Sequence, residues 1–327
     1  MYQVEHVDAK TIDQAKAALG KGDAMVNAGG TDLVPYLKGM FSPVIPKTIV
    51  NLKNIPGLSY IREEGGNLRI GALTTLTEIA KSDLVKGKYT AVAEAAKSVA
   101  APELRNMGTI GGNICQSSRC TYYRNEYNDF PCLRKVRGGE CYALTGYNRK
   151  YHGVFGMINQ CVAVCPSDVG FALVAMDASI VTTSRTIAAS SFFANNTVAQ
   201  GNERINVLNN DEIVTEIRIP TPAAGVKSTY RKFAFRKAID FAVVSVAVKV
   251  TVSGGNASNA AIVLGGVAGI PRRATAAEAA INNGAINEAR AAAAGEAAIT
   301  GNVPLSQNHY KLQIIKTLVR RTLLSLA

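Results

Sequence analysis

The residues of this sequence best suited to chemistry are six cysteines, and all of them fall between positions 115 and 165. A chain of 327 residues without a secretory signal has little use for a disulfide framework, so the thiols favour metal or redox chemistry. Four of them are spaced too widely for the paired C-x-x-C knuckles of a zinc ribbon: Cys120, Cys132, Cys141 and Cys161. Four thiolates from one loop are what a [4Fe–4S] cluster requires, and loop ligands can converge from irregular spacing. Reduced cysteines in a partner-binding loop are the alternative.

Two glycine-rich turns have the composition of phosphate-binding loops. The first spans residues 27–33 (Asn-Ala-Gly-Gly-Thr-Asp-Leu), and the second spans residues 109–113 (Thr-Ile-Gly-Gly-Asn). Paired glycines let backbone N–H groups approach a phosphate, and Thr31 can add a hydroxyl donor. One such turn is also an ordinary strand-to-helix connection, but two together can clamp the phosphates of a dinucleotide. No Walker A and no G-x-G-x-x-G sequence occurs, which argues against a P-loop NTPase or a Rossmann domain.

Other function classes find little support. The three histidines, His6, His152 and His309, form no His-x-x-x-His pair, so a mononuclear metal hydrolase is not expected. No Ser–His–Asp arrangement can be argued from spacing. The formal charge of +12 would suit a nucleic-acid partner, but Lys and Arg are scattered and no nucleic-acid-binding motif accompanies them. A basic surface facing an acidic partner subunit or an anionic cofactor is the simpler interpretation.

The start of the chain, MYQVEHVDAK, has neither the basic residues nor the apolar run of a signal peptide. No apolar stretch approaches the roughly 18 residues that a membrane span needs. We therefore expect a cytoplasmic protein.

Local signals indicate the elements that position these residues. A capping box at Thr11–Gln14 predicts a helix to Leu19, and another at Thr75–Glu78 precedes an alanine-rich helix over 90–100. A glycine-rich turn is expected at 108–113, and regular structure resumes at 169–176. Apolar runs predict strands at four places, residues 24–26, 48–52, 68–70 and 180–183.

A linker composition, Pro-Thr-Pro-Ala-Ala-Gly-Val-Lys at 220–227, predicts a domain boundary. The remainder is predicted as an α+β domain with strands over 241–252 and 260–264 and three helices, near 275–282, 286–298 and 307–324. The chain thus divides into residues 1–57, 58–220 and 226–327. The cysteine stretch, about 115–165, has eight Tyr or Phe residues and little periodicity, so it is predicted to be an insertion in the second part.

Five motifs in order resemble one family, the FAD-binding subunits of the molybdenum hydroxylases, which include the flavin domain of xanthine dehydrogenases and the medium subunit of carbon monoxide dehydrogenases. The motifs are Ala-Gly-Gly-Thr-Asp-Leu at 28–33, Ile-Gly-Ala-Leu-Thr-Thr at 70–75, Arg-Asn-Met-Gly-Thr-Ile-Gly-Gly-Asn-Ile-Cys at 105–115, Pro-Ser-Asp at 166–168 and Ala-Gly-Ile-Pro-Arg-Arg at 268–273. They cover nearly the whole chain, and a C-terminal helix over 309–321 also matches. The implied fold is α+β, with two FAD-binding subdomains followed by a C-terminal antiparallel sheet with helices.

The resemblance also implies the FAD contacts. These are Asn27, Ala28, Gly29, Gly30, Thr31, Asp32, Leu33, Thr109, Ile110, Gly111, Gly112, Asn113, Asp168, Val214 and Lys232. The backbone of 28–31 and of 109–112 would bind the pyrophosphate, and Asn113 and Asp168 would lie near the ribityl chain or flavin ring. Lys232 matches a family lysine beside the isoalloxazine, where a cation stabilises the reduced flavin and raises its potential. A solvated lysine at a strand edge is the alternative, and Arg236 and Asp240 are interpreted as structural.

The insertion departs from the common family pattern, because some fifty residues separate Asn113 from Pro166 where most members have about ten. In this respect the chain resembles the β subunit of 4-hydroxybenzoyl-CoA reductases, which carries an additional [4Fe–4S] cluster. The resemblance implies Cys120, Cys132, Cys141 and Cys161 as ligands, with Cys165 as the substitute for Cys161. Cys115 is left out because clusterless relatives often have cysteine there. The insertion is basic, and positive charge near an anionic cluster raises its potential.

The expected function is electron transfer within a molybdenum-containing hydroxylase or reductase complex. FAD in this chain would exchange electrons with a small [2Fe–2S] subunit and a large molybdopterin subunit, in a dimer of heterotrimers. Ferredoxin or NAD would be the external carrier, with ferredoxin favoured by the extra cluster. Acyl-CoA, purine and other N-heterocycle substrates stay open. The alternatives are a flavin subunit of a purine or N-heterocycle dehydrogenase, a stand-alone FAD oxidase and a nucleic-acid binder.

Overall fold

The first part of the chain forms a three-stranded parallel sheet in the order β1-β3-β2. The computed structural model describes residues 3–43, 45–146, 149–158, 160–193 and 204–327. The elements of this part are β1 (Glu5–Asp8), α1 (Ile12–Leu19), β2 (Ala24–Asn27), α2 (Leu33–Lys38) and β3 (Thr48–Asn51). Thr11 caps α1 by accepting a hydrogen bond from the Gln14 N–H at 3.2 Å, as predicted. Leu19 of that helix packs against Val50 and Leu52 in the core of this part.

A five-stranded antiparallel sheet follows, in the order β4-β5-β8-β6-β7. Its strands are β4 (Ile61–Glu64), β5 (Asn67–Gly71), β6 (Ser179–Thr182), β7 (Thr186–Ala188) and β8 (Val214–Pro220). The helices between them are α3 (Leu76–Lys81), α4 (Asp83–Lys88), α5 (Thr90–Ser98), α6 (Pro102–Met107), α7 (Ile110–Cys115), α9 (Asp168–Ala175) and α10 (Ala189–Phe192). The alanines of α5 and the apolar residues of α9 are almost completely buried, so both helices lie in the core rather than on the surface.

The prediction of a turn at 108–113 was wrong, because most of that segment is helical. Thr109 is the N-cap of α7, and its hydroxyl accepts a hydrogen bond from the Gly112 N–H at 3.2 Å. The motif was interpreted as a turn because paired glycines disfavour a helix interior. The capping threonine and the burial of Ile110 and Ile114 outweigh that cost.

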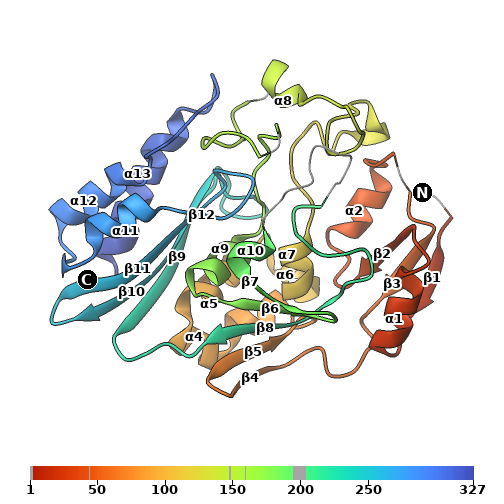
Figure 1. Cartoon of the computed structure of the whole chain (residues 1–327), viewed down its shortest axis with the longest axis horizontal. Coiled ribbons are helices and arrows are strands. Elements are labelled where there is room, and N and C mark those ends of the chain that lie inside the picture. The colour runs from red at the N-terminus through yellow and green to blue at the C-terminus, as the bar shows by residue number, and fades with distance from the viewer. Residues whose placement is uncertain (1–2, 44, 147–148, 159, 194–203) are drawn as a thin grey trace.

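The C-terminal part is an antiparallel sheet in the order β12-β11-β10-β9, with β13 paired to β11. Its elements are β9 (Val226–Phe233), β10 (Val244–Ser253), β11 (Asn256–Gly265), β12 (Arg272–Arg273), α11 (Thr275–Ile281), β13 (Gly284–Ala285), α12 (Glu288–Ala297) and α13 (Tyr310–Leu324). Helices α11 to α13 cover one face (Figure 1). The other face packs on α5 and α9, where the Ala91 N–H donates to the Ser228 hydroxyl at 3.2 Å. The predicted α+β fold with a C-terminal antiparallel sheet and helices is therefore confirmed.

The described residues of the cysteine-rich stretch form little regular structure apart from the 3-10 turn η1 (Glu126–Asn128) and α8 (Tyr142–Thr145). Figure 1 shows it across one side of the molecule, between α2 and α13. Tyr36 and Phe41 pack against its Tyr123 and Cys132, so the stretch is anchored on the first part of the chain. Among the described residues, no helix combines the length and apolar character of a membrane span.

The contact between α9 and the C-terminal sheet can be tested by overpacking. A Cβ added at Gly265 would lie 2.2 Å from the Phe171 ring and 2.3 Å from the Ser245 hydroxyl. We expect Gly265→Ala to lower the free energy of unfolding by about 1–3 kcal/mol, measured by urea denaturation. Gly87→Ala is the matched control, since nothing lies within 4 Å of its added Cβ in α4. Equal stability of the two variants would contradict this packing.

Candidate functional site

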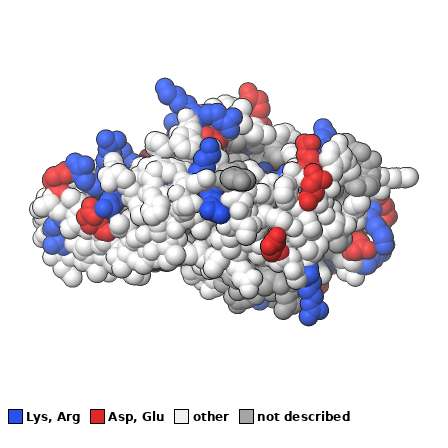
Figure 2. All heavy atoms as spheres, turned by 90° about the horizontal axis from the view of Figure 1, so that it is seen from above, with Lys and Arg blue, Asp and Glu red and all other residues white. Residues whose placement is uncertain are grey.

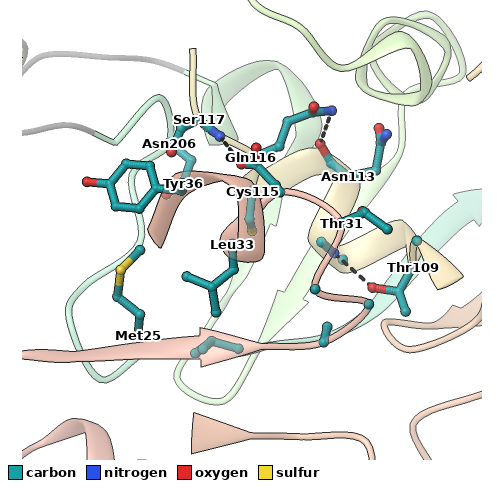
Figure 3. A pocket seen from close by; sticks show the side chains of 18 of the residues that line it. Met25, Thr31, Leu33, Tyr36, Thr109, Asn113, Cys115, Gln116, Ser117 and Asn206 are labelled. Atoms are coloured by element: carbon teal, nitrogen blue, oxygen red, sulfur yellow. Dashed lines mark hydrogen bonds between the residues drawn. The ribbon is translucent and has the colours of Figure 1, made fainter. Parts of the chain in front are cut away.

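A cavity of about 820 Å³ lies between the first two sheets and extends to the β9–β10 connection. Its size falls in the range of small-molecule and cofactor sites. Five stretches of chain contribute lining residues, within 19–52, 72–76, 99–119, 166–214 and 232–241, and Lys135 lines the cavity as well. Figure 3 shows residues of both glycine-rich motifs, Thr31 and Thr109 among them, around the same space.

The two glycine motifs meet through their backbones. A Cβ at Gly29 would lie only 2.1 Å from the carbonyl oxygen of Met107, so no larger residue fits there without displacing the second loop. Gly30 has a φ of +73°, a backbone conformation that favours glycine. Such close, glycine-built loops form concave surfaces that suit phosphate groups. The cavity volume and this cradle both fit a dinucleotide.

Most of the residues predicted to contact a cofactor line this cavity. They are Ala28, Gly29, Gly30, Thr31, Asp32, Leu33, Thr109, Gly111, Gly112, Asn113, Asp168, Val214 and Lys232. Two others lie outside it. The Asn27 amide donates to the Asn51 side chain at 3.2 Å, and Ile110 is fully buried in the core. Direct contact of each residue with a cofactor stays a prediction.

Asp168 and Lys232 form a buried ion pair at one wall of the cavity. Lys232 Nζ lies 2.7 Å from Asp168 Oδ2, and its side chain is only 10% exposed. The Tyr230 hydroxyl donates to Asp168 Oδ1 at 2.6 Å, and burial together with this carboxylate raises the tyrosine pKa. The interpretation of Lys232 as a solvated strand-edge lysine is thus wrong. Its charge is held in place and is partly balanced by the carboxylate.

Asp32 lines the cavity, but its carboxylate holds the cysteine-rich stretch. Oδ1 lies 2.6 Å from a guanidinium nitrogen of both Arg119 and Arg124, and Oδ2 accepts from the Ser117 N–H at 2.9 Å. Burial lowers the pKa of Arg119 to about 10, and the nearby Asp32 opposes that shift. The first glycine motif and the insertion are therefore joined by charge.

Sequence reasoning missed several residues that line the cavity. They include Met25, Tyr36, Gln116, Ser117 and Arg119. A polar segment before β8 adds Arg204, Ile205, Asn206, Leu208, Asn209 and Asn210. That segment has no motif, and its proximity depends on sheet pairing distant in sequence. Asp240, interpreted as structural, pairs with Arg236 but also lines the cavity.

The four cysteines named from sequence line a second, small cavity inside the insertion. Cys120, Cys132, Cys141 and Cys161 all face it, together with Tyr122, Tyr123 and Tyr142, whereas Cys115 and Cys165 do not. Burial raises the pKa of the Cys120 thiol to about 12 and also raises those of Cys132 and Cys141, and the nearby Cys161 sulfur adds to each rise. Among the described residues, no group of three or more His, Cys, Asp or Glu has the arrangement of a single-ion site.

Two buried cations separate the cavities. Arg134 lines the cysteine cavity, and its Nε donates to Cys161 Sγ at 3.2 Å. The next residue, Lys135, lines the large cavity, with its ammonium 5.8 Å from the centre of the Tyr123 ring. In the same way, Arg119 lines the large cavity and the next residue, Cys120, lines the cysteine cavity. At two places, residues 119–120 and 134–135, consecutive residues therefore line different cavities.

Comparison with known proteins gives the family. The family described as "FAD binding domain in molybdopterin dehydrogenase" matches residues 2–222, and "CO dehydrogenase flavoprotein C-terminal domain" matches residues 228–326. The chain belongs to the FAD-binding subunits of the molybdenum hydroxylases. It is an oxidoreductase subunit, and most residues that line the large cavity belong to the part matched as the FAD-binding domain.

Comparisons with individual relatives support this family assignment. The Escherichia coli (strain K12) "Aldehyde oxidoreductase FAD-binding subunit PaoB" is 32% identical over 295 residues, which is 88% of this chain and 87% of the relative. The "Carbon monoxide dehydrogenase medium chain" of Hydrogenophaga pseudoflava is 29% identical over 98% of this chain and 95% of its own. A solved structure of carbon monoxide dehydrogenase from that organism superposes with a TM-score of 0.76, covering 99% of this chain and 97% of the other.

The cradle makes a direct prediction for FAD affinity. Gly29→Ala places a methyl group against the Met107 carbonyl and pushes the two loops apart. We expect FAD to bind at least tenfold more weakly, a loss of about 1.4 kcal/mol, measured by flavin fluorescence titration of the apoprotein. Gly20→Ala is the control, because its nearest non-neighbouring atom would lie at 3.4 Å and it does not line the cavity. Unchanged affinity in Gly29→Ala would show that FAD does not depend on this cradle.

Proposed function

We propose that this chain transfers electrons between an external carrier and two partner subunits, a small [2Fe–2S] protein and a large molybdopterin protein, in a dimer of heterotrimers. The family and the similarity to chains called "medium chain" and "FAD-binding subunit" support this role. The proposed division into residues 1–57, 58–220 and 226–327 assigns the flavin to the first two parts. Substrate chemistry then belongs to the molybdenum partner.

Within the large cavity, the backbone of 28–31 and 109–112 would hold the FAD pyrophosphate. The Asp168–Lys232 pair would lie beside the flavin, where the lysine favours negative charge and the carboxylate limits that effect. FAD, when bound, supplies a centre that exchanges electrons in pairs or singly. Around it, the chain provides fixed charges and a shaped cavity.

We further propose that Cys120, Cys132, Cys141 and Cys161 hold a [4Fe–4S] cluster. The observation that carries this proposal is that these four thiols line one buried cavity next to the flavin cavity, while the other two cysteines lie elsewhere. The donor set fits the group, since four thiolates and a buried guanidinium suit an anionic cluster. Iron binding would also reverse the raised thiol pKa values, because a coordinated thiol is deprotonated.

A one-electron centre beside the flavin favours a one-electron carrier such as ferredoxin over NAD. It also favours the role of a 4-hydroxybenzoyl-CoA reductase β subunit. The rate at which each carrier reduces the complex, measured for ferredoxin and for NAD in turn, distinguishes these two carriers. Rapid exchange with NAD and slow exchange with ferredoxin would overturn the choice of carrier.

A second candidate is a flavin subunit of a dehydrogenase for aldehydes or N-heterocycles, with the cysteines unligated. The similarity to aldehyde oxidoreductase and to the "Nicotinate dehydrogenase FAD-subunit" of Eubacterium barkeri favours it. A stand-alone oxidase would turn over a substrate with oxygen without partners. A nucleic-acid binder would show salt-dependent binding, but the face seen in Figure 2 carries both signs of charge in separate groups rather than a continuous basic surface.

The cluster proposal predicts the iron content of the full chain. After anaerobic purification we expect about four irons and four sulfides per FAD. Serine at any of Cys120, Cys132, Cys141 or Cys161 should lower the iron content, because each supplies one of four ligands. Cys115→Ala and Cys165→Ala are matched controls that should retain it. A wild-type chain with FAD and no iron would reduce the insertion to an interface loop.

The proposed position of Lys232 beside the flavin predicts how its replacement changes the flavin reduction potential. Lys232→Gln removes the cation and leaves Asp168 unbalanced, so we expect the two-electron potential to fall by roughly 30 mV, which corresponds to about 1.4 kcal/mol. A dye-coupled redox titration of the full chain measures it. Lys227→Gln is the control on the same strand, since Lys227 Nζ binds the backbone carbonyls of Leu326 and Ala327 instead. A potential that does not change in Lys232→Gln would place the flavin ring away from this residue.

A further inference from the structure

The second half of the insertion is tied along its length to the segment before and at the start of α13. The Arg149 N–H donates to the Gln307 side chain at 3.1 Å, and the Tyr310 hydroxyl donates to the Lys150 carbonyl at 2.9 Å. The Val303 N–H donates to the Val154 carbonyl at 2.7 Å. Residues 149–155, called the strap below, are thus positioned by residues 303–311 of the C-terminal part.

Two buried side chains make the central contacts to the strap. Asn308 Nδ2 donates to the carbonyls of His152 and Gly153 at 3.2 and 2.9 Å. Lys311 Nζ donates to the carbonyls of Tyr151 and Gly266 at 3.1 and 2.8 Å. Neither Asn308 nor Lys311 is exposed, and burial lowers the lysine pKa to about 7. A buried amide and amine need these acceptors, so the strap backbone and α13 fix each other.

The strap carries one side chain to the cysteine cavity. His152 is buried, and its Nε2 lies 3.3 Å from Cys120 Sγ. A sulfur that binds iron carries no proton, so in a loaded site this contact requires the imidazole to donate its N–H to the sulfur. The mechanism of electron transfer does not otherwise use His152.

We propose that the C-terminal part raises the reduction potential of the cluster by holding the His152 N–H against the Cys120 sulfur. The inference rests on the proposed cluster. An N–H donor draws negative charge from the ligand sulfur and stabilises the more negative reduced cluster, which is how hydrogen bonds to sulfur set such potentials. Asn308 and Lys311 act as positioning residues, because their side-chain N–H groups donate to the strap backbone and to Gly266 rather than to a cysteine sulfur.

The test measures the cluster potential of the full chain by an EPR-monitored redox titration. We expect His152→Leu to keep about four irons and to show at least a tenfold lower ratio of reduced to oxidised cluster at a fixed potential, which is 59 mV for one electron. His152→Gln, which keeps an N–H donor, should recover part of that shift. Asn308→Ala should shift the potential in the same direction, because the strap then holds the imidazole less firmly.

His309→Leu is the matched control, an exposed histidine on the same segment that should leave the potential unchanged. An unchanged potential in His152→Leu with the iron retained would overturn the inference while leaving the cluster proposal intact. If His152→Leu loses its iron, Asn308→Ala decides, and an unchanged potential there overturns the inference. Absence of iron from the wild-type chain would instead overturn the cluster itself.

Discussion

The structure depends on the direct contact of two backbone turns, one that follows strand β2 and one that joins helices α6 and α7. Gly29, after β2, lies against the Met107 carbonyl, before α7, with no room for a side chain between them. Residues of both turns line the large cavity, so this contact lies at its wall. Glycine at position 29 is therefore required on steric grounds, and the same backbone is the one proposed to hold the pyrophosphate.

Charged side chains hold the cysteine-rich insertion in place and line both cavities. The Asp32 carboxylate accepts from Arg119 and Arg124 and so holds the insertion on the first glycine motif. Arg119, Arg134 and Lys135 then place positive charge along the wall between the cavities. Both proposed occupants, a pyrophosphate and a thiolate-bound cluster, are anionic. If both are bound, part of the net charge of +12 would serve these two sites rather than a nucleic acid.

Much of the fold could be predicted from sequence because its signals are local. Capping residues such as Thr11 and Thr75 mark helix starts, a valine-rich run marks β10, and a shorter apolar run marks the second half of β11. The helical state of 110–115 was missed, since its glycines have low helix propensity and its stability comes from burial.

The residues of the two cavities likewise include some that the sequence predicts and some that it does not. The glycine motifs and the four cysteines could be named because their residue types restrict their chemistry. The segment around Asn206 could not, because it reaches the cavity only through strand pairing of β8 with β5 and β6. The contact of His152 with Cys120 depends on a helix more than 150 residues further along the chain, and no local pattern reports it.

The dependence of the strap on α13 has a consequence for biosynthesis. The cysteines leave the ribosome early, but residues 149–155 can reach their final place only after residues 303–311 have been translated. Because domains form in the order of synthesis, the flavin-binding sheets can fold while the cysteine cavity is still open on one side. Until α13 docks, the cysteine cavity therefore lacks the contacts of its strap, and the thiols of the nascent chain stay more accessible than those of the folded protein.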